Sequence, residues 1–96
     1  MKENVIKTKS FAFALRVVKL AKHLQREKQE YVLSKQVLRS GTAIGALVRE
    51  AEHAQSKADF INKLNLALKE ANETEYWIDL LHLADYISTD SYDSRH

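Results

Sequence analysis

Apolar residues recur with the period of an α-helix along three long stretches of this chain, at about 10–28, 34–55 and 56–84. The whole sequence contains two glycines and no proline, so the helices are expected to be long and unbroken. A chain of 96 residues supports one hydrophobic core, which the helices must therefore share. The pattern predicts a single domain over residues 1–96, with an all-α, up-and-down antiparallel helical-bundle fold.

Serines mark the expected helix starts. Ser10 and Ser34 are predicted to cap the first and second helices, because a serine hydroxyl accepts hydrogen bonds from the unpaired N–H groups of a first turn. Ser56, followed by Asp59, resembles a capping box and predicts the start of the third helix. Another cap-like segment, at 88–91, predicts a fourth helix that begins within 89–96 and is incomplete.

The first and third helices are apolar on more than one side. The first helix has one stripe of Phe11, Ala14, Leu15, Val18 and Ala21, and beside it a second stripe of Phe13, Val17, Leu20 and Leu24. With residues about 100° apart, the two stripes cover roughly 220°, whereas packing on one core needs an arc of about 100°. The third helix has a main stripe of Phe60, Leu64, Ala67, Leu68, Ala71, Ile78 and Leu81, adjoined by Leu66, Trp77 and Leu80. This excess of apolar surface predicts that the chain assembles with copies of itself.

The second helix is narrow in its middle. Its core stripe is Val37, Gly41, Ile44, Val48 and Ala51, flanked by Ser40, Ala43 and Gly45. A glycine inside a helix costs about 1 kcal/mol relative to alanine, so close packing of another helix at Ser40, Gly41 and Gly45 is the expected compensation. Backbone contact with a ligand is the weaker alternative, because no glycine-rich phosphate loop surrounds the two glycines.

Charge is divided unevenly along the chain, although the net charge is only +2. Residues 1–49 contain eleven Lys or Arg and three acids, a net of +8, whereas residues 50–96 contain four and ten, a net of −6. The simplest explanation is attraction between basic and acidic helices, within the bundle or between subunits. Three carboxylates of the third helix lie beside apolar positions and need cationic partners. They are Glu70, Glu73 and Glu75, and the candidate partners are Arg39, Arg49 and Lys63.

Basic residues recur at helical spacing, which favours contact with a phosphate backbone. They are Arg16, Lys19, Lys22, His23 and Arg26 on the first helix and Lys35, Arg39 and Arg49, aligned with His53, on the second. The alternative is a solvated face that is paired with the acidic half of the chain. Because no aromatic residue is placed to stack on bases, sequence-specific recognition is not predicted.

Enzymatic chemistry has little support in the sequence. The fragment from Glu50 to His53 has the E-x-x-H spacing of helical di-iron proteins, and Asp79 to His82 is a weaker copy. Glu50 and His53 are expected on a face rich in Lys and Arg, where a metal ion would meet like charges. His82 is expected to interact with the C-terminus of its helix. With no Cys, nucleophile elbow or nucleotide loop, we predict no catalytic residue, no metal site, no cofactor and no enzyme.

Targeting segments are not recognisable. The apolar run at 11–15 is ended by Arg16, well short of the apolar region of about 7 to 15 residues in a signal peptide. No apolar run approaches the roughly 18 residues of a membrane span. We therefore expect a soluble, cytoplasmic protein without a membrane partner.

Two longer motifs make the sequence familiar. They are LRSGTAIGA at 38–46 and ALKEANETEYW at 67–77, accompanied by EA at 50–51 and ADF at 58–60. In this combination the chain resembles, over roughly residues 10–87, a bacterial family of four-helix-bundle proteins encoded in intervening sequences of 23S ribosomal RNA genes. Members are sometimes labelled ribosomal proteins.

The resemblance implies an up-and-down bundle that assembles as a ring-shaped homopentamer and has no enzymatic activity. A relative in diversity-generating retroelements is an accessory protein that binds nucleic acid and a reverse transcriptase. Relatives continue through a full fourth helix. The surface that this helix covers on the first and third helices is therefore expected to be open here.

Two hypotheses for function follow. The favoured one is an oligomeric, non-enzymatic scaffold that binds RNA or DNA through its basic helix faces. The alternative is a protein-interaction scaffold or accessory subunit for a nucleic-acid enzyme, in which the same basic residues contact a protein.

Overall fold

Helices and their short connections make up the part of the chain that the computed structural model describes, residues 5–93. The elements are α1 (Val5–Glu27), α2 (Leu33–Glu52), α3 (Lys57–Leu83) and the short α4 (Thr89–Asp93). The all-helical prediction is confirmed. Of the predicted fourth helix the structure describes α4, and residues 94–96 lie outside the described residues.

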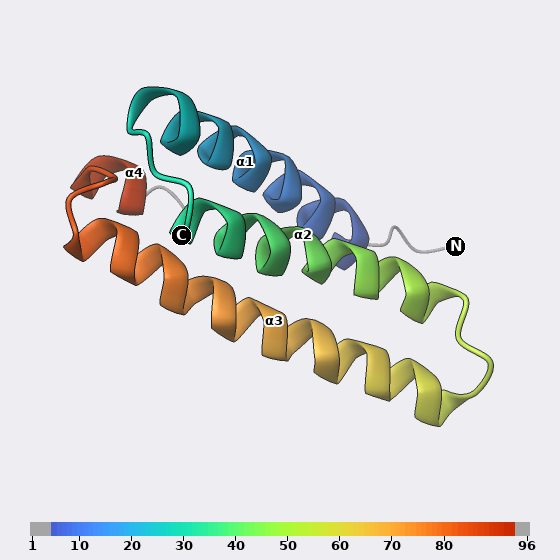
Figure 1. Ribbon diagram of the computed structural model, residues 1–96. Coiled ribbons are helices and arrows are strands. Elements are labelled where there is room, and N and C mark those ends of the chain that lie inside the picture. The colour runs from blue at the N-terminus through green and yellow to red at the C-terminus, as the bar shows by residue number, and fades with distance from the viewer. Residues whose placement is uncertain (1–4, 94–96) are drawn as a thin grey trace.

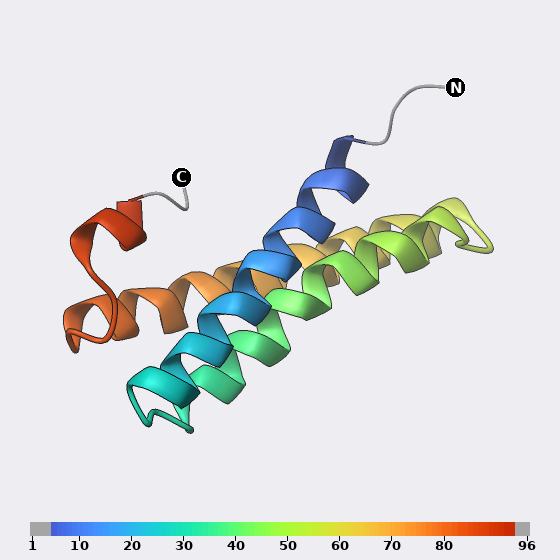
Figure 2. The same cartoon turned by 90° about the horizontal axis from the view of Figure 1, so that it is seen from above.

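The three long helices lie in a row with α2 in the middle (Figure 1). Within residues 5–93, the backbones of α1 and α3 each lie close along α2 but not close to each other. Seen from above, α1 lies over α2, and α4 lies beside the C-terminal end of α3 (Figure 2). Short connections between successive helices enforce this up-and-down order. As a result α2 is covered from two sides, whereas α1 and α3 each have one long neighbour.

All three long helices contribute to the core. Leu24, Val37, Ile78 and Leu81 form a buried cluster, which joins α1, α2 and α3 near the end where α4 begins. Farther along, α2 and α3 meet at a buried polar contact, where the hydroxyls of Ser40 and Thr74 lie 2.8 Å apart. Each hydroxyl also lies within hydrogen-bond distance of the carbonyl four residues earlier in its helix. These hydroxyls are therefore satisfied despite their burial.

The middle of α2 lets α1 approach closely. A Cβ atom at Gly41 would lie 2.8 Å from Cγ2 of Val17, and one at Gly45 would lie 3.3 Å from the backbone oxygen of Ser10. The first distance is impossible for a real Cβ, and the second leaves little room. Glycine at these positions thus allows the α1 backbone and its buried Val17 to sit directly on α2.

The two apolar stripes of α1 differ in how far they are buried. Val17 and Leu24 of the second stripe are in the core together with Ala21. Phe11 and Leu15 of the other stripe are 60% and 49% exposed. On α3, Phe60 and Leu68 of the predicted main stripe are likewise exposed. None of the described helices combines the length and apolarity that crossing a membrane requires.

The predicted cap at Ser10 is wrong. The helix begins at Val5, so Ser10 lies in its second turn and donates a hydrogen bond to the carbonyl of Lys7 (3.1 Å). Ser10 is also buried against Gly45. A small side chain at this position serves the close packing of the two helices, which a pattern of helix caps does not consider.

The predicted cap at Ser34 is also wrong, because Glu30 takes that role. The Glu30 carboxylate accepts hydrogen bonds from the N–H groups of Val32 (3.2 Å), Leu33 (2.9 Å) and Ser34 (2.7 Å). Ser34 lies within the first turn of α2, and its hydroxyl donates to the carbonyl of Glu30 (2.8 Å). A carboxylate at a helix N-terminus is favourable, since it meets the partial positive charge of the unpaired N–H groups.

Ser56 does cap α3 as predicted. Its hydroxyl accepts from the N–H of Asp59 (3.0 Å), and the Asp59 carboxylate accepts in return from the N–H of Gln55 (3.4 Å). The ends of α1 and α3 are less easily recognised in the sequence. Gln29 and Asp85 there have φ angles of 57° and 67°, a left-handed conformation that glycine usually provides.

Replacing Glu30 with alanine should lower the free energy of unfolding by about 1–3 kcal/mol, because three N–H groups at the start of α2 lose their acceptor. Urea denaturation followed by circular dichroism, at one fixed protein concentration, measures the change. Glu27→Ala is the matched control, since Glu27 is exposed at the end of α1. Equal stability of the two variants would contradict the capping role of Glu30.

Candidate nucleic-acid interface

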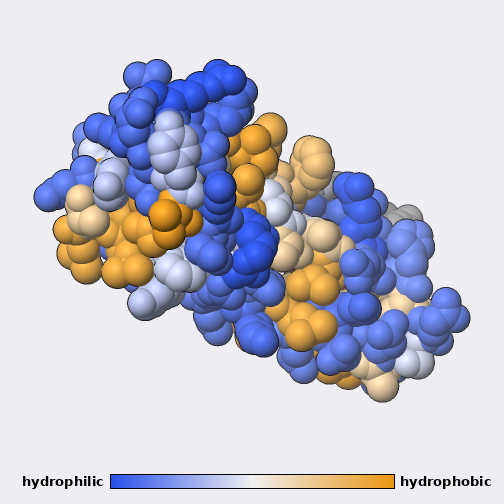
Figure 3. Space-filling view, in the orientation of Figure 1, coloured by the Kyte–Doolittle hydropathy of each residue, from blue (hydrophilic) through white to orange (hydrophobic). Residues whose placement is uncertain are grey.

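The helix α1 is strongly basic. It contains a single acidic residue, Glu27, at its last position. The predicted phosphate-binding residues of this helix are all exposed. They are Arg16, Lys19, Lys22, His23 and Arg26, called here the α1 basic row. Figure 3 shows hydrophilic residues gathered over the C-terminal half of α1, whereas hydrophobic residues reach the surface along α3.

The ion pairs found within residues 5–93 all involve α2. Lys7 of α1 pairs with Glu52 (3.2 Å), and Lys63 of α3 pairs with Glu50 (3.0 Å). The hydrogen bond and the negative charge of Glu50 raise the pKa of Lys63 above its usual value. Lys19, Lys22 and Arg26 take part in none of the ion pairs found within residues 5–93. Attraction between the two halves therefore leaves much of the α1 basic row unneutralised.

The cations of α2 are divided between its two neighbours. Arg39 pairs with Glu70 (3.3 Å) and Glu73 of α3, as expected for these carboxylates. On the other side, the Arg49 guanidinium lies 5.9 Å from the centroid of the Phe11 ring of α1, a cation–π contact. Lys35 is exposed in the first turn of α2. These three residues thus do not form a second continuous row beside the first.

The E-x-x-H fragments are engaged in structural contacts. Glu50 is paired with Lys63, and His53 is the residue that ends α2. Asp79 accepts a hydrogen bond from the Tyr92 hydroxyl (2.8 Å), and the His82 ring stacks on the Tyr92 ring at 4.1 Å. In the described part of the chain, no three His, Asp or Glu side chains are grouped closely enough to hold a metal ion.

A polar pocket of about 470 Å³ opens beside the α1 basic row. It is named here the corner pocket. Its lining residues are Leu20 and His23 of α1, Lys28 just after α1, His82 of α3, residues 85–88 of the connection to α4, and Thr89 at the start of α4. His23 belongs both to this pocket and to the α1 basic row. No local motif in the sequence marks this pocket, because its walls come from segments more than fifty residues apart.

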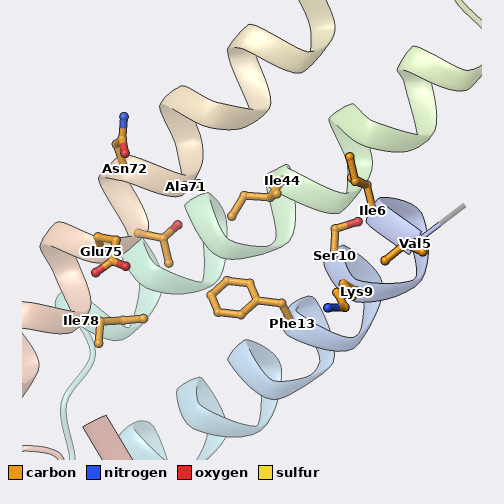
Figure 4. Close-up of a pocket in the computed structure, with 11 residues that line it drawn as sticks. Val5, Ile6, Lys9, Ser10, Phe13, Ile44, Ala71, Asn72, Glu75 and Ile78 are labelled. Carbon is orange, nitrogen blue, oxygen red and sulfur yellow. The ribbon is translucent and has the colours of Figure 1, made fainter. Parts of the chain in front are cut away.

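A second pocket, of about 480 Å³, lies between α1 and α3 (Figure 4). Its walls are mainly apolar, with Phe13 from α1, Ile44 from α2 and Ile78 from α3 turned toward one another. Lys9 and Glu75 add one charge of each sign.

Comparison with known proteins agrees with the helical architecture. The family model described as 23S rRNA-intervening sequence protein matches residues 2–96. A crystal structure of a protein with unknown function, from the S23 ribosomal protein family of Bacteroides thetaiotaomicron, has 63% sequence identity and a TM-score of 0.93. The alignment covers 94% of this chain and 83% of that one. No curated protein matches the chain.

Arg39→Ala should lower the free energy of unfolding by less than about 1 kcal/mol, because ion pairs exposed to solvent contribute little. The Arg39 side chain is 50% exposed. Fluorescence of Trp77 follows unfolding next to this ion pair, because the Trp77 indole N–H donates to the Glu73 carboxylate (3.0 Å). Lys35→Ala on the same helix is the control. A loss of more than about 3 kcal/mol would instead mark a pair that is buried.

Proposed function

This chain belongs to the 23S rRNA-intervening sequence protein family, and we propose that it is a cytoplasmic, non-enzymatic protein that assembles with copies of itself and binds RNA or DNA through basic helix faces. The crystal structure of the similar protein is described as having unknown function. The proposal therefore rests on the side chains of this chain. The observation that carries it is the exposed, largely unneutralised α1 basic row.

The dimensions of the α1 basic row suit a nucleic-acid backbone. From Arg16 to Arg26 the helix rises about 15 Å at 1.5 Å per residue. Duplex DNA carries roughly nine phosphate charges over that length, at one per 1.7 Å. Several lysines and arginines at this spacing can contact phosphates of one backbone. Such contacts give affinity without reading the sequence of bases.

The cations of α2 have a smaller part in the proposed contact. Arg39 and Arg49 already contact the Glu70 and Glu73 carboxylates and the Phe11 ring. A phosphate would have to compete with these partners. Lys35 is exposed and extends the basic surface from the start of α2. The α1 basic row is therefore the main site, and α2 supplements it.

Exposed apolar side chains support assembly. On α1, Phe11 and Leu15 are 60% and 49% exposed, and on α3 Leu68 and Tyr76 are 61% and 57% exposed. These surfaces differ in their surroundings, since α1 is rich in cations and α3 is rich in carboxylates. Contact between the α1 face of one copy and the α3 face of the next joins two different surfaces. Head-to-tail contacts of this kind close into rings, and the resemblance to relatives implies five subunits.

An accessory role without direct nucleic-acid binding is the second candidate. The same exposed stripe of α1, with cations beside it, also suits a protein partner that has an acidic rim around an apolar centre. In that case the basic residues select the partner and speed its association.

Affinity for a generic RNA should fall about a hundredfold as salt rises from about 50 to 200 mM, if about four phosphates are contacted. Lys19→Glu combined with Arg26→Glu should weaken binding and flatten this dependence. Lys57→Glu combined with Lys69→Glu on α3 is the control, with the same change in charge. Fluorescence anisotropy with labelled RNA measures both.

Equal affinity of the two double variants would contradict binding through α1. Loss of a protein complex in the α1 variant, with RNA binding unchanged, would favour the accessory role.

Light scattering coupled to gel filtration should give a native mass several times 11.0 kDa, and five times that value for a pentamer. Leu15→Glu should reduce the mass toward that of one chain, because it places a carboxylate in the proposed apolar contact. Val32→Glu is the control, since Val32 is 72% exposed in the turn before α2. A monomeric wild-type protein would contradict assembly.

A further inference from the structure

The corner pocket combines groups of different chemistry in one small volume. Lys28 offers positive charge, Lys28 and His23 offer hydrogen-bonding groups, and Ser88 and Thr89 offer hydroxyls. Asp85 contributes a carboxylate, while Leu20 and Ile87 contribute apolar surface. A simple anion makes no favourable contact with a carboxylate or with an apolar wall. A ligand with a charged part, a flat apolar part and amino groups matches all of these groups.

The ring side of the pocket is held in place before any ligand arrives. His82 lies parallel to Tyr92, with ring centroids 4.1 Å apart and planes inclined by 19°. The Tyr92 hydroxyl donates to Asp79 (2.8 Å), and His82 Nε2 lies 3.4 Å from the Thr89 hydroxyl oxygen. Tyr86 of the pocket wall packs partly against the core. Flat side chains fixed in this way form surfaces on which a base can stack.

The backbone of the connection is fixed as well. Asp85 has a left-handed φ of 67°, and its N–H donates to the carbonyl of His82 (3.1 Å). The N–H groups of Ala84 and Tyr86 donate to the carbonyls of Leu80 and Leu81 (both 2.9 Å). The side chain of Asp85 is thus presented from a defined turn.

The pocket continues the proposed nucleic-acid surface, because His23 belongs to both. Its volume of about 470 Å³ falls in the range of about 300–1,000 Å³ that small-molecule sites occupy. A base in a duplex is stacked and paired, whereas a base of a single strand can turn out and enter such a pocket.

Building on the proposed function, we propose that the corner pocket binds one unpaired nucleotide of a single-stranded nucleic acid. The base lies against the Tyr86 and His82 side, and the phosphate lies toward Lys28 and His23. The Asp85 carboxylate accepts hydrogen bonds from amino groups of the base, so cytosine is preferred to uracil.

Titration of the wild-type protein with CMP, UMP and inorganic phosphate, followed by NMR of backbone amides, tests the pocket directly. CMP should shift amides at 82–89, and it should bind about tenfold more tightly than UMP because of the charged hydrogen bond. Asp85→Asn should remove most of this difference, since asparagine tolerates the left-handed backbone but offers a mixed amide in place of a carboxylate. Equal effects of CMP and inorganic phosphate would overturn the proposal in favour of a plain anion site. An absence of shifts with CMP would overturn it too.

Oligonucleotides separate the pocket from the α1 basic row. A single-stranded oligonucleotide should bind about fivefold or more tightly than a duplex of the same length, as expected for one stacked base. Lys28→Glu should reduce this preference more than the control Lys57→Glu. Equal affinity for both forms, with the salt dependence intact, would overturn the pocket and leave the proposed function standing. Absence of binding to either form would instead overturn the proposed function, and the mononucleotide titration would still decide the pocket.

Discussion

Close packing of α2 on both of its sides determines how the other helices are placed. Gly41 and Gly45 bring the α1 backbone within contact distance, and the hydroxyls of Ser40 and Thr74 join α2 to α3. The helix α2 has small residues on the sides that face α1 and α3, and it occupies the middle of the row of three helices. In residues 5–93, the backbones of α1 and α3 stay apart, and the apolar pocket lies between the two helices. The open apolar surface of α1 and α3 is thus a direct consequence of a central helix that is shared by two neighbours.

The same arrangement decides which charges remain available. The α3 carboxylates Glu70 and Glu73 are within reach of α2, and they pair with Arg39. Lys63 and Lys7, from the two outer helices, pair with the C-terminal carboxylates of α2. Ion pairs therefore form where α1 and α3 lie against α2, and none of those found within residues 5–93 includes Lys19, Lys22 or Arg26 of α1.

Periodicity and composition predicted the helices, the close packing at the middle of α2 and the cap at Ser56, because each of these depends on residues that are close together in the sequence. The caps at Ser10 and Ser34 were wrong, since a packing contact and the nearby Glu30 carboxylate outweighed the local pattern. The two apolar stripes on α1 indicated that two sides of this helix favour burial. The pattern of apolar residues does not indicate which of the two sides packs against the rest of the chain. The corner pocket was missed for a related reason. His23 and His82 have no relation along the sequence, and only the packing of the helices brings them to one cavity.

Assembly and nucleic-acid binding are linked in the proposed function by the geometry of α1. Lys19 follows Leu15 by four residues, and Lys22 follows Val18 by four, so each cation lies one turn from an exposed apolar side chain. In the proposed assembly, burial of that stripe against the next copy would place the α1 basic rows at a fixed spacing. A single row makes a few phosphate contacts, which are weak at physiological salt. Rows repeated at a fixed spacing act on one strand together, and each contact after the first occurs at high effective concentration. Under this proposal, a chain with a net charge of only +2 would acquire a strongly basic surface, because the cations concentrated on α1 would be repeated by the assembly.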